Sequence, residues 1–80
     1  MDRKEIEEKV KEILSEELGI KREAITPEKR LIEDLGMDSF KAIELMFEIE
    51  DKFNIEIKED DMKNIKRVRD AVKYIEERMD

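Results

Sequence analysis

Residues 34–53 of the chain read DLGMDSFKAIELMFEIEDKF and combine a tight turn with the start of a long helix. Gly36 permits the backbone geometry of a tight turn, and Asp38 is a residue type that caps helix N-termini. An apolar-periodic run begins at Phe40, which predicts that a helix starts at about Ser39 and runs to the end of this stretch. Ser39 therefore falls in the first helical turn, with its hydroxyl near the surface.

The N-terminal segment predicts a helix over about residues 3–17. Asp2 and Glu5 have the spacing of a capping box, with Asp in place of the usual Ser or Thr, and Gly19 ends the helix. Four apolar residues at steps of three and four form its buried stripe: Ile6, Val10, Ile13 and Leu14.

A connection of about 20 residues separates the first two predicted helices, and so long a structured connection usually carries a site. Within it, Thr26-Pro27-Glu28 is typical of the start of a short helical turn, since Pro27 sits where its missing N–H costs nothing. We expect its apolar residues to pack on the core: Ile20, Ile25, Leu31, Ile32 and Leu35.

The C-terminal part predicts two more helices. Residues 54–58 alternate as a strand would, but no second strand-like run exists to pair with them, so we interpret them as a loop. A short third helix over about 59–64 begins at acidic residues, which suit a helix N-terminus, and a fourth begins at Val68. The fold class is all-α, a four-helix bundle in which residues 1–80 form a single domain.

Composition narrows the functional classes. The chain of 80 residues has no cysteine, which excludes disulfides and thiolate metal sites and fits a reducing compartment. A net charge of -7 opposes binding to nucleic acid or anionic lipid. No apolar run approaches the roughly 20 residues needed to span a bilayer. We therefore expect a soluble, cytoplasmic monomer with no membrane span.

The negative charge is concentrated rather than spread. Residues 31–62 contain 11 acidic side chains against three lysines, a net of -8, whereas the rest of the chain sums to +1 from 13 acidic and 14 basic residues. On a helical wheel of the predicted 39–53 helix, Glu44, Glu48 and Asp51 share one side with Lys41 and Lys52. Two further sets complete the wheel, a core face of Ala42, Leu45, Met46, Ile49 and Phe53 and a border of Phe40, Ile43 and Phe47 beside the carboxylates.

The patterns typical of catalytic or metal-binding sites are missing, although a carboxylate pair such as Asp34 and Asp38 could in principle do acid-base work. The chain has no histidine, so Ser39 has no imidazole base, and Lys41 points away from it on the wheel. No twelve-residue calcium loop can be found, and two glycines cannot form a phosphate-binding loop. We expect neither catalytic nor metal-binding residues, and therefore no enzyme.

The chain resembles the acyl carrier proteins. The resemblance runs without gaps from about residue 3 to residue 78, and the order of helices with a long first connection agrees with that family. The residues that carry it are Asp34-Leu35-Gly36-Met37-Asp38-Ser39-Phe40, Glu44-Leu45, Phe53, Ile55-Glu56-Ile57, and Val68 with Ala71, Tyr74 and Ile75.

The resemblance implies that Ser39 is an attachment point rather than a catalyst. A phosphopantetheinyl transferase would move 4'-phosphopantetheine from coenzyme A to its hydroxyl, and the arm would carry acyl groups as thioesters for fatty acid synthesis. Asp38 would take part in transferase recognition by helping to hold the magnesium ion of the transferase complex. The core side of the second helix would admit an acyl chain between the helices.

The resemblance also implies a docking surface for acyl-processing enzymes with basic patches. Recognition would be weak and salt-sensitive, because each exposed ion pair contributes only about 0.2 to 1 kcal/mol. The charged contacts would be Glu44, Glu48, Asp51 and Glu56, and the apolar contacts Phe40, Phe47 and Ile57. Phe40 and Lys41 depart from the family's usual leucine and acidic or small residue, which bears on partner choice.

Two alternatives remain at this point. Carriers of the polyketide, nonribosomal peptide or D-alanine pathways are also acidic and helical. A helical adaptor of the same fold that carries nothing is the alternative of a different class, and the intact serine motif argues against it.

Overall fold

The computed structural model describes residues 1–79 and contains three α-helices and two short 3₁₀ helices. The order is α1 (Arg3–Leu18), η1 (Arg22–Ala24), α2 (Ser39–Phe53), η2 (Glu59–Asn64) and α3 (Val68–Arg78). The all-α four-helix prediction is confirmed, with η2 as the short third helix in 3₁₀ rather than α form. No helix within residues 1–79 combines the length and hydropathy of a bilayer-spanning segment.

Local capping explains where α1 begins and ends. Asp2 accepts a hydrogen bond from the backbone N–H of Glu5 at 2.9 Å, as the capping-box spacing predicts. Gly19 adopts a left-handed backbone (φ 67°), and its N–H donates to the carbonyl of Ser15. The predicted apolar stripe is buried: Ile6, Val10, Ile13 and Leu14.

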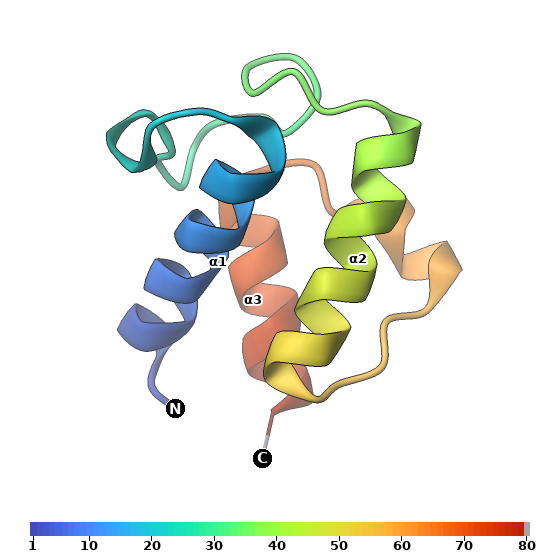
Figure 1. Cartoon of the computed structure of the whole chain (residues 1–80). Helices are drawn as coiled ribbons and strands as arrows, with labels where there is room; N and C mark the ends of the chain where they lie inside the picture. The colour runs from blue at the N-terminus through green and yellow to red at the C-terminus, as the bar shows by residue number, and fades with distance from the viewer. Residues whose placement is uncertain (80) are drawn as a thin grey trace.

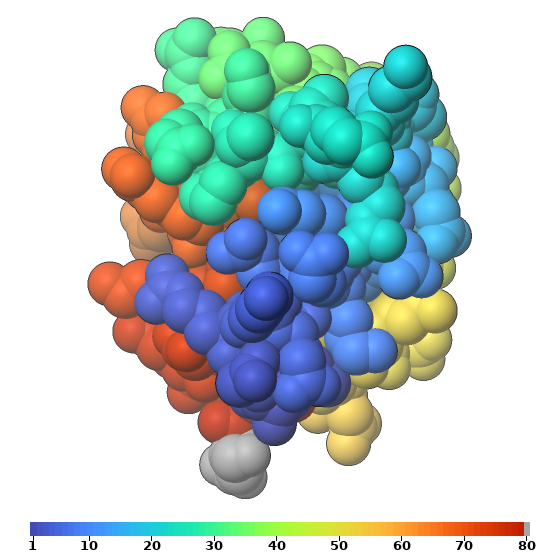
Figure 2. All heavy atoms as spheres, turned by 90° about the vertical axis from the view of Figure 1, so that its left-hand side faces the viewer, coloured from blue at the N-terminus to red at the C-terminus, as the bar shows by residue number. Residues whose placement is uncertain are grey.

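The core lies between the three α-helices, which stand side by side with α1 packed against both α2 and α3 (Figure 1). The long connection crosses one end of the bundle and covers it with a continuous layer of atoms above α1 (Figure 2). The described core contains only hydrophobic side chains, contributed by every α-helix and by both long loops. Burial of apolar surface is therefore the main term that holds the bundle together.

The connection is fastened to the start of α3 by backbone hydrogen bonds. The N–H of Leu31 donates to the carbonyl of Lys66 at 2.9 Å, and the N–H of Val68 donates to that of Lys29 at 3.1 Å. These two bonds pair segments far apart in the sequence. They fix the chain shortly before α2 and thereby set the position of the α2 N-terminus.

Two sequence predictions about the connection are corrected. The helical turn is η1 at Arg22–Ala24, whereas Thr26 begins only a single turn closed by its bond from Lys29 N–H. Ile32 is 62% exposed instead of packing on the core. The cause is the tight turn that follows Arg30, which directs Leu31 and Leu35 inward and leaves Ile32 on its outer side.

The last helix begins without a hydroxyl cap. The carboxylate of Asp70 accepts hydrogen bonds from the backbone N–H groups of Arg67 at 2.9 Å and Lys66 at 3.1 Å. A residue inside the first turn thus reaches back to the helix entrance, which is the reciprocal half of a capping box. The backbone N–H groups of Lys66 and Arg67 therefore have an acceptor at this helix start.

Candidate functional site

The turn before α2 is organised by Asp34. Its Oδ2 accepts hydrogen bonds from the backbone N–H of Arg30 at 2.8 Å and from Arg30 Nε at 3.2 Å. Gly36 takes a left-handed backbone (φ 75°), and Met37 is buried, with its N–H bonded to the carbonyl of Leu31. The chain therefore enters α2 from a fixed direction.

The pKa of Asp34 is lowered, first by the side-chain hydrogen bond from Arg30 and then by the backbone hydrogen bond from the same residue. A lowered carboxyl pKa stabilises the folded chain above the ordinary aspartate pKa. That contribution is lost as the pH falls through the lowered value, below about pH 3.9. The Asp34 carboxylate therefore stays ionised near neutral pH and keeps its hydrogen bonds to Arg30.

Ser39 is the first residue of α2 and is exposed. Its hydroxyl makes no hydrogen bond to the residues that the structure describes. Beside it, Asp38 is the N-cap: its Oδ1 accepts from the backbone N–H of Lys41 at 2.8 Å, and its carbonyl accepts from Ala42. The hydroxyl is thus presented to solvent at the capped start of α2.

Two substitutions of Asp38 test whether its side chain stabilises the start of α2 as a hydrogen-bond acceptor or through its charge. Asp38→Ala is expected to lower the free energy of unfolding by about 0.5–2 kcal/mol, because an N–H at the start of α2 loses its acceptor. Asp38→Asn keeps an oxygen acceptor and is expected to stay close to the native stability. Urea unfolding followed by circular dichroism measures both; equal losses for the two variants would contradict a capping role.

An apolar stripe runs along the exposed side of α2 from its first turn. Phe40 is 68% exposed and Phe47 is 59% exposed, and Ile43 lies between them at helical spacing. Phe40 and Phe47 lie about two turns apart, and Ile43 between them completes a contiguous apolar surface, a feature that is typical of interaction sites. The border position that the helical wheel assigned to these residues is confirmed.

The predicted docking carboxylates differ in their surroundings. Glu44 is half-buried and lies 3.8 Å from Lys41 Nζ, so part of its charge is already balanced. Glu48 is also half-buried, whereas Asp51 and Glu56 are exposed. The first three share α2, and Glu56 lies in the loop that follows it. The carboxylates of Asp51 and Glu56 are the most accessible of the four.

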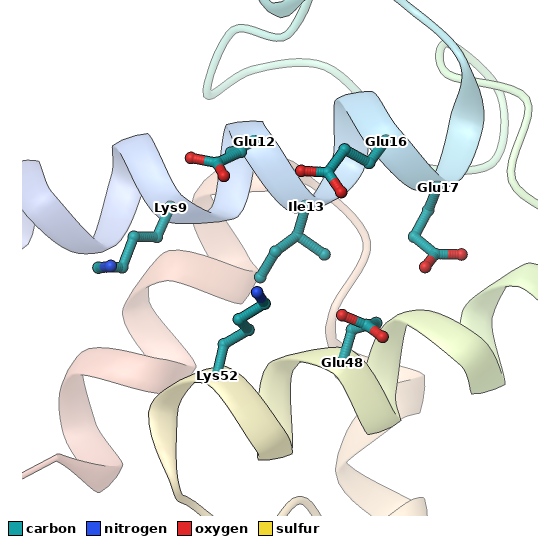
Figure 3. Close-up of a pocket in the computed structure, with 7 residues that line it drawn as sticks. All are labelled: Lys9, Glu12, Ile13, Glu16, Glu17, Glu48 and Lys52. Carbon is teal, nitrogen blue, oxygen red and sulfur yellow. The ribbon is translucent and has the colours of Figure 1, made fainter.

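Acidic side chains of α1 lie beside the docking carboxylates of α2, which the sequence did not predict. Glu17 and Glu48 project toward one another from the two helices, at a hollow of about 70 Å³ where Lys52 projects toward Ile13 (Figure 3). These side chains come together only because α1 packs against α2. A helical wheel of one helix cannot predict that they are close. The full lining is Lys9, Glu12, Ile13, Glu16, Glu17, Glu48 and Lys52.

Ile57 does not fit its predicted role as a surface contact, because its side chain is only 7% exposed. The carboxylate of Glu50 accepts a hydrogen bond from the Ile57 N–H at 2.8 Å and holds this loop against α2. Ile57 instead lines a small apolar cavity of about 20 Å³ between the helices. The other lining residues are Leu31, Met37, Leu45, Met46, Ile49, Met62, Ile65, Ala71, Tyr74 and Ile75.

Residues 8–75 match the family model described as a phosphopantetheine attachment site. The chain is 43% identical over 70 residues to acyl carrier proteins from two strains of Nitratidesulfovibrio vulgaris, an alignment that covers 88% of this chain and 92% of each relative.

Solved structures agree with these sequence matches. A candidate acyl carrier protein from Mycobacterium tuberculosis superposes with a TM-score of 0.84 at 37% identity, over 89% of this chain and 95% of the other. An acyl carrier protein from Enterococcus faecalis gives 0.83 at 35% identity, over 98% and 99%.

Proposed function

This chain belongs to the acyl carrier protein family, and from that premise we propose that Ser39 is the residue to which the 4'-phosphopantetheine arm is attached. The observation that carries the proposal is the Ser39 hydroxyl, exposed and without a hydrogen bond in the described chain, at the capped start of α2. When attached, the arm supplies a terminal thiol that carries acyl groups as thioesters. The Ser39 oxygen attacks the coenzyme A phosphorus that bears the pantetheine arm. The phosphodiester bond forms as the pyrophosphate bond of coenzyme A breaks, 3',5'-ADP leaves, and a group on the transferase takes the serine proton.

The test is incubation of the protein with coenzyme A and a phosphopantetheinyl transferase, followed by mass spectrometry of the intact chain and of its peptides. We expect one phosphopantetheine per chain, on the peptide that contains Ser39. The chain has only one other serine, Ser15, on a different helix, so the two sites are distinguishable. No mass gain, or a gain on another peptide, would overturn the assignment.

Fatty acid synthesis is the pathway proposed for this carrier, in keeping with its acyl carrier protein relatives. A malonyltransferase of fatty acid synthesis is expected to load the modified protein. Loading only by an adenylating ligase would instead support a nonribosomal peptide or D-alanine carrier. Residues 1–80 are proposed to act as one carrier domain, a cytoplasmic monomer that transports acyl groups and catalyses no reaction itself.

The proposed docking surface consists of Phe40 and Phe47 with the carboxylates of Glu44, Glu48, Asp51 and Glu56. Its support is the exposed apolar stripe of α2 beside negative charge. Basic patches on the transferase and on acyl-processing enzymes are the complementary surfaces. Such contacts are weak individually, which suits a carrier that must dissociate after each step.

Neutralising one accessible carboxylate tests this surface. Asp51→Asn is expected to lower kcat/KM for transferase loading by about 1.4- to 5-fold at low salt, the range for one exposed ion pair. The difference from the native chain is expected to shrink as salt screens the pair. Glu23→Gln, an exposed neutralisation on η1, is the matched control and should leave loading unchanged. An equal loss of kcat/KM in both variants would show that the overall charge of the chain, and not this surface, determines loading.

A further inference from the structure

The apolar cavity between the helices is too small for an acyl chain in the folded protein. Its volume of about 20 Å³ leaves room for about one water-sized sphere. An acyl chain can therefore enter only if one wall moves outward. The identity of that wall decides which residues control entry.

η2 is the wall that is held least firmly. The helices α2 and α3 pack on α1 and bury several side chains each, whereas η2 buries none and has no side-chain cap. It is a 3₁₀ helix of six residues, a form with poorer hydrogen-bond geometry than an α-helix. It contributes Met62 to the cavity lining, and Ile65 follows directly after it. Displacement of η2 is thus the opening that breaks the fewest contacts.

A polar cluster fastens η2 to α3. Asp61 Oδ2 accepts hydrogen bonds from Tyr74 OH at 2.6 Å and from Arg78 Nη2 at 2.9 Å. The Arg78 guanidinium lies 4.0 Å from the centre of the Tyr74 ring, a cation–π contact. The Lys58 N–H donates to Tyr74 OH at 3.4 Å. The pKa of Asp61 is lowered, first by the bond from Tyr74 and then by that from Arg78.

Tyr74 has two roles in this arrangement, because its ring lines the cavity and its hydroxyl holds the wall. Opening the wall costs a fixed amount, namely the bonds of the cluster. Burying an acyl chain gains a similar increment for every methylene, so the gain rises with chain length. A threshold length follows, below which the acyl group stays outside.

We propose that Asp61, Tyr74 and Arg78 form a latch between η2 and α3 that sets the shortest acyl chain this carrier takes between its helices. The proposal rests on attachment of the arm at Ser39. These three are specificity-determining residues: a stronger latch excludes longer chains, and a weaker one admits shorter chains.

The first test uses the unmodified protein and needs no arm. Asp61→Asn and Tyr74→Phe are expected to accelerate amide hydrogen exchange at the Ile65 N–H, which donates to the Met62 carbonyl. The expected factor is about 2- to 12-fold, the equivalent of one lost hydrogen bond. Asp60→Asn makes the same charge change at an exposed position of η2 and should not alter this rate. Unchanged exchange in the two latch variants would overturn the proposal.

The second test measures the threshold. Acyl forms of each variant from butyryl to octanoyl, in steps of one carbon, are exposed to hydroxylamine, which cleaves thioesters that remain outside. The chain length at which protection begins is expected to shorten by about one or two methylenes in Asp61→Asn and Tyr74→Phe, because one hydrogen bond is comparable to that much burial. The Asp60→Asn threshold should equal the native one.

The two tests separate the latch from the attachment site. A common threshold in all variants, or an equal shift in Asp60→Asn, would overturn the latch even if exchange accelerates. Failure to attach the arm at all would overturn the assignment of Ser39, and the exchange rates of the unmodified chain would still decide whether η2 is latched.

Discussion

Ser39→Ala is expected to abolish phosphopantetheine addition completely while leaving the helical bundle intact. The reaction loses its only proposed acceptor oxygen. The fold loses little, because the Ser39 hydroxyl is exposed and makes no hydrogen bond within residues 1–79. Intact mass after incubation with coenzyme A and the transferase measures the first effect, and urea unfolding measures the second.

Ser15→Ala is the matched control, since it removes the only other serine hydroxyl of the chain. Ser15 Oγ donates to the carbonyl of Ile20 and ties the end of α1 to the connection. This variant is expected to lose about 0.5–1.5 kcal/mol of unfolding free energy, the usual net value of one hydrogen bond. Its modification should be complete. A mass gain that survives Ser39→Ala would contradict the assignment of the attachment site.

The start of α2 was predictable from the sequence because its signals are local. Gly36 and Asp38 act through their own backbone geometry and through a bond three residues away, so the position of Ser39 follows from neighbours alone. The same holds for the two ends of α1. Such features need no knowledge of how the helices pack.

The sequence failed where packing between distant segments decides the outcome. Ile57 reads as an exposed residue of a loop, but Glu50 draws that loop inward. Glu17 lies near Glu48 only because α1 packs against α2. The cluster of Asp61, Tyr74 and Arg78 likewise joins residues 13 and 17 positions apart from two elements. The periodicity of a single helix cannot predict these contacts between different elements.

Ile75→Ala is expected to produce a larger loss of stability than any of the polar substitutions above. Ile75 is 1% exposed and lines the apolar cavity, so truncation removes buried methyl groups and enlarges a void that already exists. The expected loss is about 2–5 kcal/mol of unfolding free energy. Small domains commonly have only about 5–15 kcal/mol in total. Urea denaturation of the unmodified protein measures the loss.

Leu14→Ala is the control that distinguishes a void in the cavity lining from a void elsewhere in the hydrophobic core. Leu14 is fully buried on α1 and does not line the cavity, so its truncation should cost a similar amount in the unmodified chain. Attachment of an octanoyl chain should then recover part of the loss in Ile75→Ala, because the acyl carbons fill the enlarged space. Leu14→Ala should gain no more than the native chain does. Equal gains in both variants would show that the acyl chain does not lie between the helices, since only one of the two voids is in its path.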